Sequence, residues 1–297
     1  PDVSLTDWVA KGFISAINFL LLVILKLLGM LLAVALSLFA WVADANNLNQ
    51  VLSNQGVYFG WTTVRDLLNI SFILILLFTA FAIVFQVDKY NKKTTILTLV
   101  IMALLINFSF PITRAIIDAS NVLMYTIIKS ISEGTNALGM LTGATGIQNI
   151  IDSAGGASTT YLLAAIVFVF ILMITMLAIS LMLVIRIVAL ALLIIFSPIA
   201  FVPLPGNKYA GEWWTNLFKY CFFGPIMMFM ILIATQIMSY MGKHSLEMKK
   251  IASAHAIDNA IVGDMAYFAI PIVILWIGMG MAQKMGIAGA GAVMGQA

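Results

Sequence analysis

One uninterrupted apolar run constrains this chain more than any other feature. From Tyr161 to Val202 about 42 residues pass with a single charged side chain, Arg186, whereas about 20 apolar residues already cross the hydrocarbon core of a bilayer. A guanidinium inside such a run costs a few kcal/mol or more unless it faces protein, water or lipid headgroups. The run therefore predicts a membrane protein, and the position of Arg186 is the central question about its function.

The composition of the whole chain supports the same conclusion. Of its 297 residues 63% are hydrophobic and only 9% are charged, and the mean hydropathy of +1.09 lies outside the range of soluble domains. The basic residues are spread over the chain and form no dense patch, so we expect no sequence-specific binding of nucleic acid. Cys221 is the only cysteine, and His244 and His255 have no partners at ligand spacing. The sequence therefore predicts no metal site and no cofactor.

Apolar segments separated by polar stretches predict the fold class. Besides the long run, the apolar segments are Phe13 to Val42, Leu67 to Phe85, Thr94 to Ile128, Trp214 to Tyr240 and Met265 to Ala282. We therefore predict that residues 1–297 form one all-α, polytopic membrane bundle of about five to seven transmembrane helices, at least one of them long or broken. The polar stretches are a Gly/Ser/Thr-rich loop at 129–160, a connector at 241–263 and a Gly/Ala-rich tail at 283–297.

The course of the long run decides the topology. As one helix it would be about 60 Å long, roughly twice the hydrocarbon thickness. A hairpin at Arg186 is disfavoured because the flanking residues include no Gly, Pro, Asn or Asp to form the turn. A break is better supported at Ser197-Pro198. Seven spans would place Lys243 on the same side of the membrane as Lys89, whereas six would not, but the local sequence favours an unbroken helix with Arg186 inside it.

Sparse polar residues inside two segments form two stripes. On the segment from Thr94 they recur at about seven-residue spacing, which keeps them on one helix face, with a kink expected at Pro111. On the long run the spacing is about eleven residues, which also preserves the face. The first stripe is Asn107, Arg114, Asp118 and Asn121; the second is Thr175, Arg186 and Ser197, with Pro198 beside it. These are candidate assembly or conduit residues that would meet in a bundle interior or line a wet cavity. The alternative is that the two arginines snorkel to the interfaces.

Catalytic signatures are absent from the sequence. It contains no HExxH, no G-x-S-x-G, no Gly-rich phosphate loop and no Cys/His pairing. Gly263-Asp264 faintly matches an intramembrane aspartyl protease, but that chemistry requires two carboxylates in one site. Asp118 is the only other acid inside a hydrophobic segment. We therefore predict that the protein is not an enzyme.

Two stretches carry a resemblance to a known family. Residues 103–109 read Ala-Leu-Leu-Ile-Asn-Phe-Ser, and the second stretch combines Arg186, the Ala-Leu-Ala-Leu of 189–192, the Ser-Pro-Ile-Ala-Phe of 197–201 and Trp213-Trp214. Together they resemble the TrbL-like polytopic subunit of bacterial type IV secretion and conjugation machines, mainly over residues 161–240. The resemblance implies a non-catalytic platform or conduit subunit in the bacterial cytoplasmic (inner) membrane. It also implies a homo- or hetero-oligomer that works with secretion ATPases and periplasmic channel proteins.

Two indications about the orientation of the chain oppose each other. The resemblance implies an N-terminus outside the cytoplasm, which fits a processed Pro1. The positive-inside rule instead assigns the loop that contains Lys89 to the cytoplasm. The orientation stays open at this stage.

The same residues also suggest an autonomous secondary transporter or small-solute channel. In that case Arg186 with Asp118 or Arg114 would bind an anion or relay protons. Transporters usually carry more intramembrane carboxylates and a detectable repeat, whereas this chain offers one such acid and no clear repeat. The secretion subunit is therefore favoured, and an accessory protein of envelope assembly is a weaker third alternative.

Overall fold

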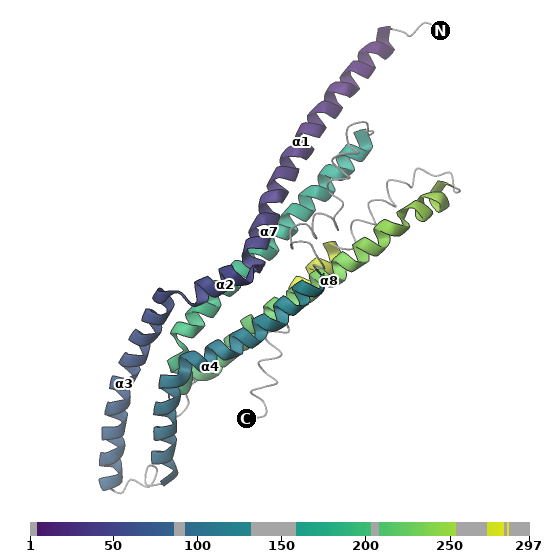
Figure 1. Cartoon of the computed structure of the whole chain (residues 1–297). Helices are drawn as coiled ribbons and strands as arrows, with labels where there is room; N and C mark the ends of the chain where they lie inside the picture. Colours follow the sequence, from purple (N-terminus) through teal and green to yellow (C-terminus); the bar gives the residue numbers. More distant parts are fainter. Residues whose placement is uncertain are drawn as a thin grey trace. The chain divides into compact units, whose positions relative to one another are not determined.

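The computed structural model describes residues 5–85, 93–131, 159–202, 208–253, 272–281 and 284. These residues are almost entirely helical and include no β-strand. The elements are α1 (Leu5–Ala43), α2 (Ala45–Leu52), α3 (Gln55–Val84), α4 (Lys93–Ile131), α7 (Thr159–Ile195), the short 3₁₀ helix η2 (Ser197–Phe201) and α8 (Lys208–Ser253), most of which are labelled in Figure 1. A shorter apolar helix runs from Ile272 to Met281.

Five helical stretches within the described residues are long and apolar enough to cross a membrane. They are Gly12–Ala43, Ala45–Val84, Leu97–Lys129, Leu162–Ile195 and Ala210–Ile237. Large apolar side chains stand exposed along each of them, which is expected where lipid rather than water surrounds the helices. The predicted all-α, polytopic membrane architecture is therefore confirmed.

The long apolar run forms one continuous helix, as its sequence predicts. Helix α7 has 37 residues, about 55 Å at 1.5 Å per residue, and it continues through Arg186 without interruption. It ends at Ile195, and η2 then begins at Ser197 with Pro198 in its first turn. Proline cannot donate a backbone hydrogen bond to continue an α-helix. The break expected at Ser197-Pro198 is therefore confirmed as the end of α7.

Helix α4 contains the whole first polar stripe. Its 39 residues include one internal proline, Pro111, and Figure 1 shows the helix bending part-way along its length. A proline removes one ladder hydrogen bond and its ring crowds the preceding turn, so it accounts for the bend that the sequence predicts.

The predicted polar stretches are only partly covered. Helix α8 continues to Ser253, so the first half of the 241–263 connector belongs to that helix. The rest of the connector, residues 132–158 of the loop and all but Lys284 of the 283–297 tail lie outside the described residues. The same holds for His255, Lys89 and Asp264.

The helices gather into two compact units, each of which is described by itself. The first unit contains α1, the end of α4, most of α7, the later part of α8 and the helix from Ile272. Hydrogen bonds join its helices α7 and α1. The hydroxyl of Ser180 donates to the Ala35 carbonyl (3.2 Å), and that of Thr159 to the Asn18 side chain (2.8 Å).

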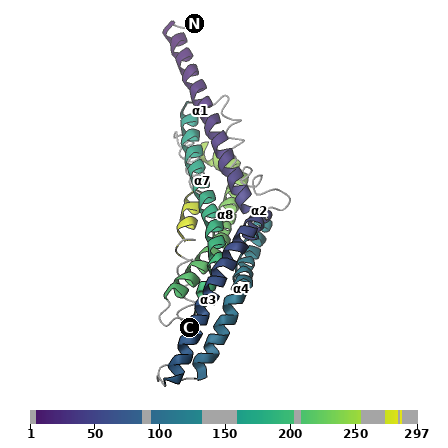
Figure 2. The same cartoon turned by 90° about the vertical axis from the view of Figure 1, so that its left-hand side faces the viewer.

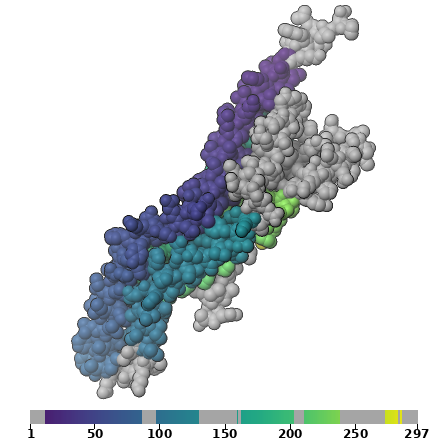
Figure 3. Space-filling view, in the orientation of Figure 1, coloured from purple at the N-terminus to yellow at the C-terminus, as the bar shows by residue number. Residues whose placement is uncertain are grey.

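The second unit contains α2, α3, most of α4, the last turns of α7, η2 and the start of α8. Figures 1 and 2 show α3 and α4 side by side, and their surfaces meet in the space-filling view of Figure 3. The start of α8 runs antiparallel to the end of α7, because Trp213 donates to the Leu193 carbonyl (3.1 Å) and Tyr220 pairs with Arg186 one heptad away. This antiparallel pair positions the buried arginine.

Candidate functional site

Arg186 lies inside the second unit and faces protein. Its side chain is only 2% exposed, and it is among the largest fully buried side chains of the described residues. The snorkelling alternative for Arg186 is therefore wrong, because a snorkelling guanidinium would extend into water or headgroups, whereas this one is covered by neighbouring helices. Such a cation is expensive in an apolar layer unless its N–H groups are hydrogen-bonded.

Two helices, α4 and α8, supply the hydrogen-bond acceptors for Arg186. Its Nε donates to the Tyr220 carbonyl of α8 (2.8 Å). Its Nη2 donates to Oδ1 of Asn121 (2.9 Å) and, more weakly, to the Ser120 hydroxyl (3.5 Å), both on α4. Nη1 contacts the sulfur of Met124 at 3.6 Å. The distances to Tyr220 and Asn121 are those of good hydrogen bonds, so Arg186 ties α7 to both α4 and α8.

The acceptors around Arg186 are all neutral. The ion pairs among the described residues are Arg65–Asp66 and Arg114–Asp118, neither of which includes Arg186. Removing the acceptors while Arg186 stays buried would leave its charge without hydrogen-bond partners, which is strongly destabilising. The site therefore suits a permanent helix contact.

Pro225 frees a backbone carbonyl of helix α8 beside the arginine. Because proline has no N–H, the carbonyl of Cys221, four residues earlier, lacks its usual helix partner. The Ser120 hydroxyl of α4 donates to that carbonyl. The carbonyl of Tyr220, one residue earlier, accepts from Arg186. The two neighbouring carbonyls of α8, those of Tyr220 and Cys221, thus bind α7 and α4 respectively.

Gly224 provides the space for the guanidinium. A Cβ added there would lie 2.7 Å from Cζ and 2.9 Å from Nε of Arg186, and 2.9 Å from the sulfur of Met124. Carbon atoms in contact are normally about 3.5–4.0 Å apart, so no larger residue fits without displacing the arginine. We call Arg186 with Ser120, Asn121, Met124, Tyr220 and Gly224 the Arg186 centre.

Only one residue of the first stripe reaches Arg186. Asn121 is buried beside it, and because arginine donates only, the amide oxygen must face the guanidinium. Arg114 instead pairs with Asp118 (3.0 Å) and donates to Asn49 of α2 (3.1 Å). The meeting of the two stripes is confirmed for Asn121 and wrong for Arg114 and Asp118. The stripe extends about 21 Å along α4, and this helix bends. Residues at different points of the stripe therefore contact different helices.

The other members of the second stripe are buried but meet different partners. Thr175, in the first unit, accepts from Trp276 Nε1 and donates to the Ile171 carbonyl, both at 2.8 Å. The hydroxyl of Ser197 is buried and has no hydrogen-bond partner among the described residues. Pro198 is buried next to it in η2. Thr175 and Arg186 are thus both buried on α7, whereas Ser197 and Pro198 are buried in η2, and the stripe does not form a single site.

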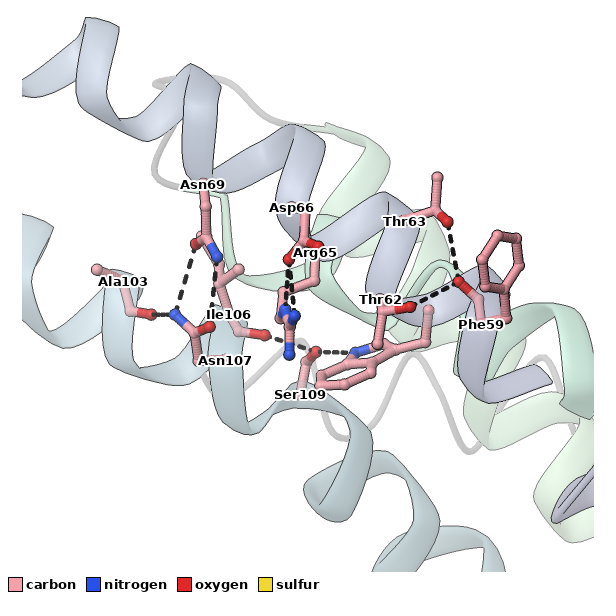
Figure 4. A network of polar contacts seen from close by, with 11 residues as sticks. Phe59, Thr62, Thr63, Arg65, Asp66, Asn69, Ala103, Ile106, Asn107 and Ser109 are labelled. Carbon is pink, nitrogen blue, oxygen red and sulfur yellow. Dashed lines mark hydrogen bonds and ion pairs between the residues drawn. The ribbon is translucent and has the colours of Figure 1, made fainter. Parts of the chain in front are cut away.

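A second polar cluster joins α3 to α4, and Figure 4 shows it. Asn69 and Asn107 form a reciprocal amide pair at 3.3 and 3.4 Å, so Asn107 belongs here and not to the Arg186 centre. Trp61 Nε1 donates to the Ser109 hydroxyl at 2.9 Å. We name Trp61, Arg65, Asp66, Asn69, Asn107 and Ser109 the α3–α4 polar cluster.

Sequence reasoning missed two parts of these sites. The pair Gly224-Pro225 inside an apolar helix is a recognisable signal, because both residues disfavour helix interiors and mark close approach or an open carbonyl. The α3 partners of the polar cluster carried no such signal. Asn69 is a single polar residue whose partner is 38 residues away in sequence.

Comparison with known proteins adds no further assignment. No protein-family model, no curated protein and no solved structure matches this chain. Among the described residues, no group of three or more histidine, cysteine or acidic side chains is placed to hold a metal ion.

Proposed function

We propose that this chain is a non-enzymatic platform or conduit subunit of a type IV secretion apparatus of the conjugation type. It would reside in the bacterial inner membrane and help to move a protein or nucleoprotein substrate across it. Its partners would be secretion ATPases, periplasmic channel proteins and further membrane subunits. The resemblance over residues 161–240 supports this function, and Arg186 and Ser197-Pro198 belong to the residues that carry it.

The observation that carries the proposal is how Arg186 uses its hydrogen bonds. Its donors are committed to α4 and α8, and its side chain is 2% exposed. A transport site would instead require the guanidinium to face a substrate path and to be coupled to a carboxylate. Asp118, the acid suggested for that role, is bound to Arg114. The geometry therefore favours assembly over autonomous solute transport.

The lengths of the helices also favour a role in assembly. Helices α1, α7 and α8 have 39, 37 and 46 residues, and each exceeds the roughly 20 residues that cross the hydrocarbon core. Helices of this length must tilt strongly or project from the bilayer. Projecting ends offer surfaces to other subunits of a membrane-spanning machine.

Mass and transport measurements on the purified protein test this function. After extraction in mild detergent, we expect a mass well above the 32.3 kDa of one chain, and no solute flux after reconstitution into liposomes. A monomer that moves solute across the liposome membrane would refute the proposal in favour of transport. Genes for secretion ATPases next to the coding sequence would support it.

A further inference from the structure

The part of α3 that follows Asp66 presents one broad face of large apolar side chains. Residues at helical spacing along this face are 54–75% exposed: Leu67, Ile70, Ile73, Leu74, Leu77, Phe78, Phe81, Val84 and Phe85. Helix α4 continues the face with Leu97, Val100, Leu104 and Phe108, which are 55–61% exposed.

Two small residues of α3 are buried, away from this face. Thr79 and Ala82 are the buried positions of α3 after Asp66. Helices that pack closely in membranes place small residues at their contacts. Thr79 and Ala82 thus mark the side of α3 that packs against protein, whereas the exposed surface consists mainly of large branched and aromatic residues, with Ala80 as its one small member on α3.

Polar groups in the hairpin are hydrogen-bonded within it. Between Leu67 and Phe85 the polar side chains are Asn69, Ser71 and Thr79. Ser71 donates to the Leu67 carbonyl (3.1 Å) and Thr79 to the Ile75 carbonyl (2.8 Å). Asn69 pairs with Asn107 of α4 (3.3 Å). Polar side chains in hydrocarbon need hydrogen-bond partners within the protein, since lipid tails offer none.

The two ends of the apolar stretch match the thickness of a bilayer. From Leu67 to Phe85 the helix is about 28 Å long, close to the roughly 30 Å of the hydrocarbon core. On the near side of Leu67, the rings of Tyr58, Trp61 and Phe110 form a cluster with centroids 5.3–5.7 Å apart. Aromatic side chains of this kind concentrate at membrane interfaces.

A charged pair accompanies the aromatic cluster. The Arg65 guanidinium lies 4.7 Å from the centre of the Trp61 ring and 2.7 Å from the Asp66 carboxylate. The Asp66 side chain is 61% exposed, which is acceptable beside water and headgroups and costly in hydrocarbon. At the other end of the stretch the sequence continues to Lys89, Lys92 and Lys93.

We propose that the α3–α4 hairpin crosses the hydrocarbon core as a two-helix anchor whose broad apolar face contacts lipid. One membrane boundary lies at Arg65 and Asp66, and the other directly follows Phe85. The α3–α4 polar cluster is then the interfacial end of the anchor, and the Asn69–Asn107 pair holds the two helices together just inside the boundary. This assignment does not depend on a role in secretion.

Spin-label accessibility of the full chain tests the lipid contact. Single cysteines at Leu74→Cys, Leu77→Cys and Phe81→Cys probe the face, with Ala82→Cys as the inward control and Ser53→Cys as the control outside the boundary. The protein is reconstituted into vesicles of phosphatidylcholine and phosphatidylglycerol. Oxygen partitions into hydrocarbon and a neutral nickel chelate into water, so their relative collision rates with the label report its surroundings.

At the three face positions we expect high oxygen and low nickel accessibility, with a ratio several-fold above that at Ser53→Cys and greatest near Leu77→Cys. Low accessibility to both reagents, as at Ala82→Cys, would mean that protein covers the face and would refute the proposal. High nickel accessibility would refute it in favour of a water-filled path. The single cysteines are introduced in a Cys221→Ser background. If that substitution reduces the yield, native Cys221 is kept, since it is only 2% exposed, and the protein without an added cysteine measures the label that Cys221 itself takes up.

Discussion

Replacing Gly224 by alanine tests the Arg186 centre with a single methyl group. In an exposed helix interior, this substitution stabilises by about 1 kcal/mol because alanine is the better helix former. Here the new Cβ would lie 2.7 Å from Cζ of Arg186. The guanidinium must move by about 0.8 Å or more to reach an ordinary contact of about 3.5 Å. The sign of the effect is therefore expected to reverse.

The magnitude follows from the hydrogen bonds that such a movement breaks. The bond from Arg186 Nε to the Tyr220 carbonyl is 2.8 Å long, and a shift of this size takes it beyond hydrogen-bonding range. A hydrogen bond to a charged group contributes about 1.5–3 kcal/mol. After the gain in helix propensity is subtracted, we expect a net loss of roughly 0.5–2 kcal/mol for one broken bond.

Cys221 provides a built-in reporter for the measurement. It is buried one turn from Gly224, so a maleimide dye that fluoresces on reaction with a thiol follows unfolding in detergent as temperature rises. Gly12→Ala in α1 is the matched control, because a Cβ at Gly12 meets nothing within 4 Å. We expect a lower transition temperature for Gly224→Ala and an unchanged or higher one for Gly12→Ala. Equal behaviour of the two variants would refute the steric argument.

Three further substitutions probe the polar contacts between helices. Arg186→Leu should abolish partner assembly or secretion while membrane insertion is retained, as measured by co-purification and alkali extraction; unchanged secretion would contradict an assembly role. Asn107→Leu should destabilise the protein by about 1 kcal/mol because it strands the amide of Asn69, and the double variant Asn69→Leu/Asn107→Leu should recover part of the loss in the same thermal assay. Ser120→Ala should cost about 1 kcal/mol in the wild-type background and less in Pro225→Ala, where the restored backbone N–H takes over the carbonyl that Ser120 serves. Equal costs in both backgrounds would contradict that coupling.

Much of the fold follows from local properties of the sequence. Hydropathy over about 20 residues predicts where helices cross a membrane. The absence of helix breakers around Arg186 predicts that α7 is continuous, and Ser197-Pro198 predicts where it ends. These properties belong to single segments, and a backbone in lipid must satisfy its own hydrogen bonds within the helix. The sequence is therefore sufficient for the architecture.

The polar sites were only partly predictable, because they depend on contacts between helices that are distant in sequence. Helical spacing shows which residues of one helix share a face, and Thr175 and Arg186 of α7 are both buried as that spacing predicts. It does not show which helix packs on that face. Arg186 meets Asn121 and Tyr220, which are 65 and 34 residues away in sequence, whereas Arg114 turns to its own neighbour Asp118.

The amino-acid sequence by itself determined that this chain is helical and membrane-embedded, and that a single charge lies within its longest apolar run. Tertiary structure alone decided what that charge does. The guanidinium packs against Gly224 of α8, and Asn121 of α4 accepts a hydrogen bond from it. Asn107 instead pairs with Asn69 of α3. Hydrophobicity acts on each segment independently and can be summed along the chain. Hydrogen bonds require two groups at about 3 Å, and only the packing of helices sets such distances.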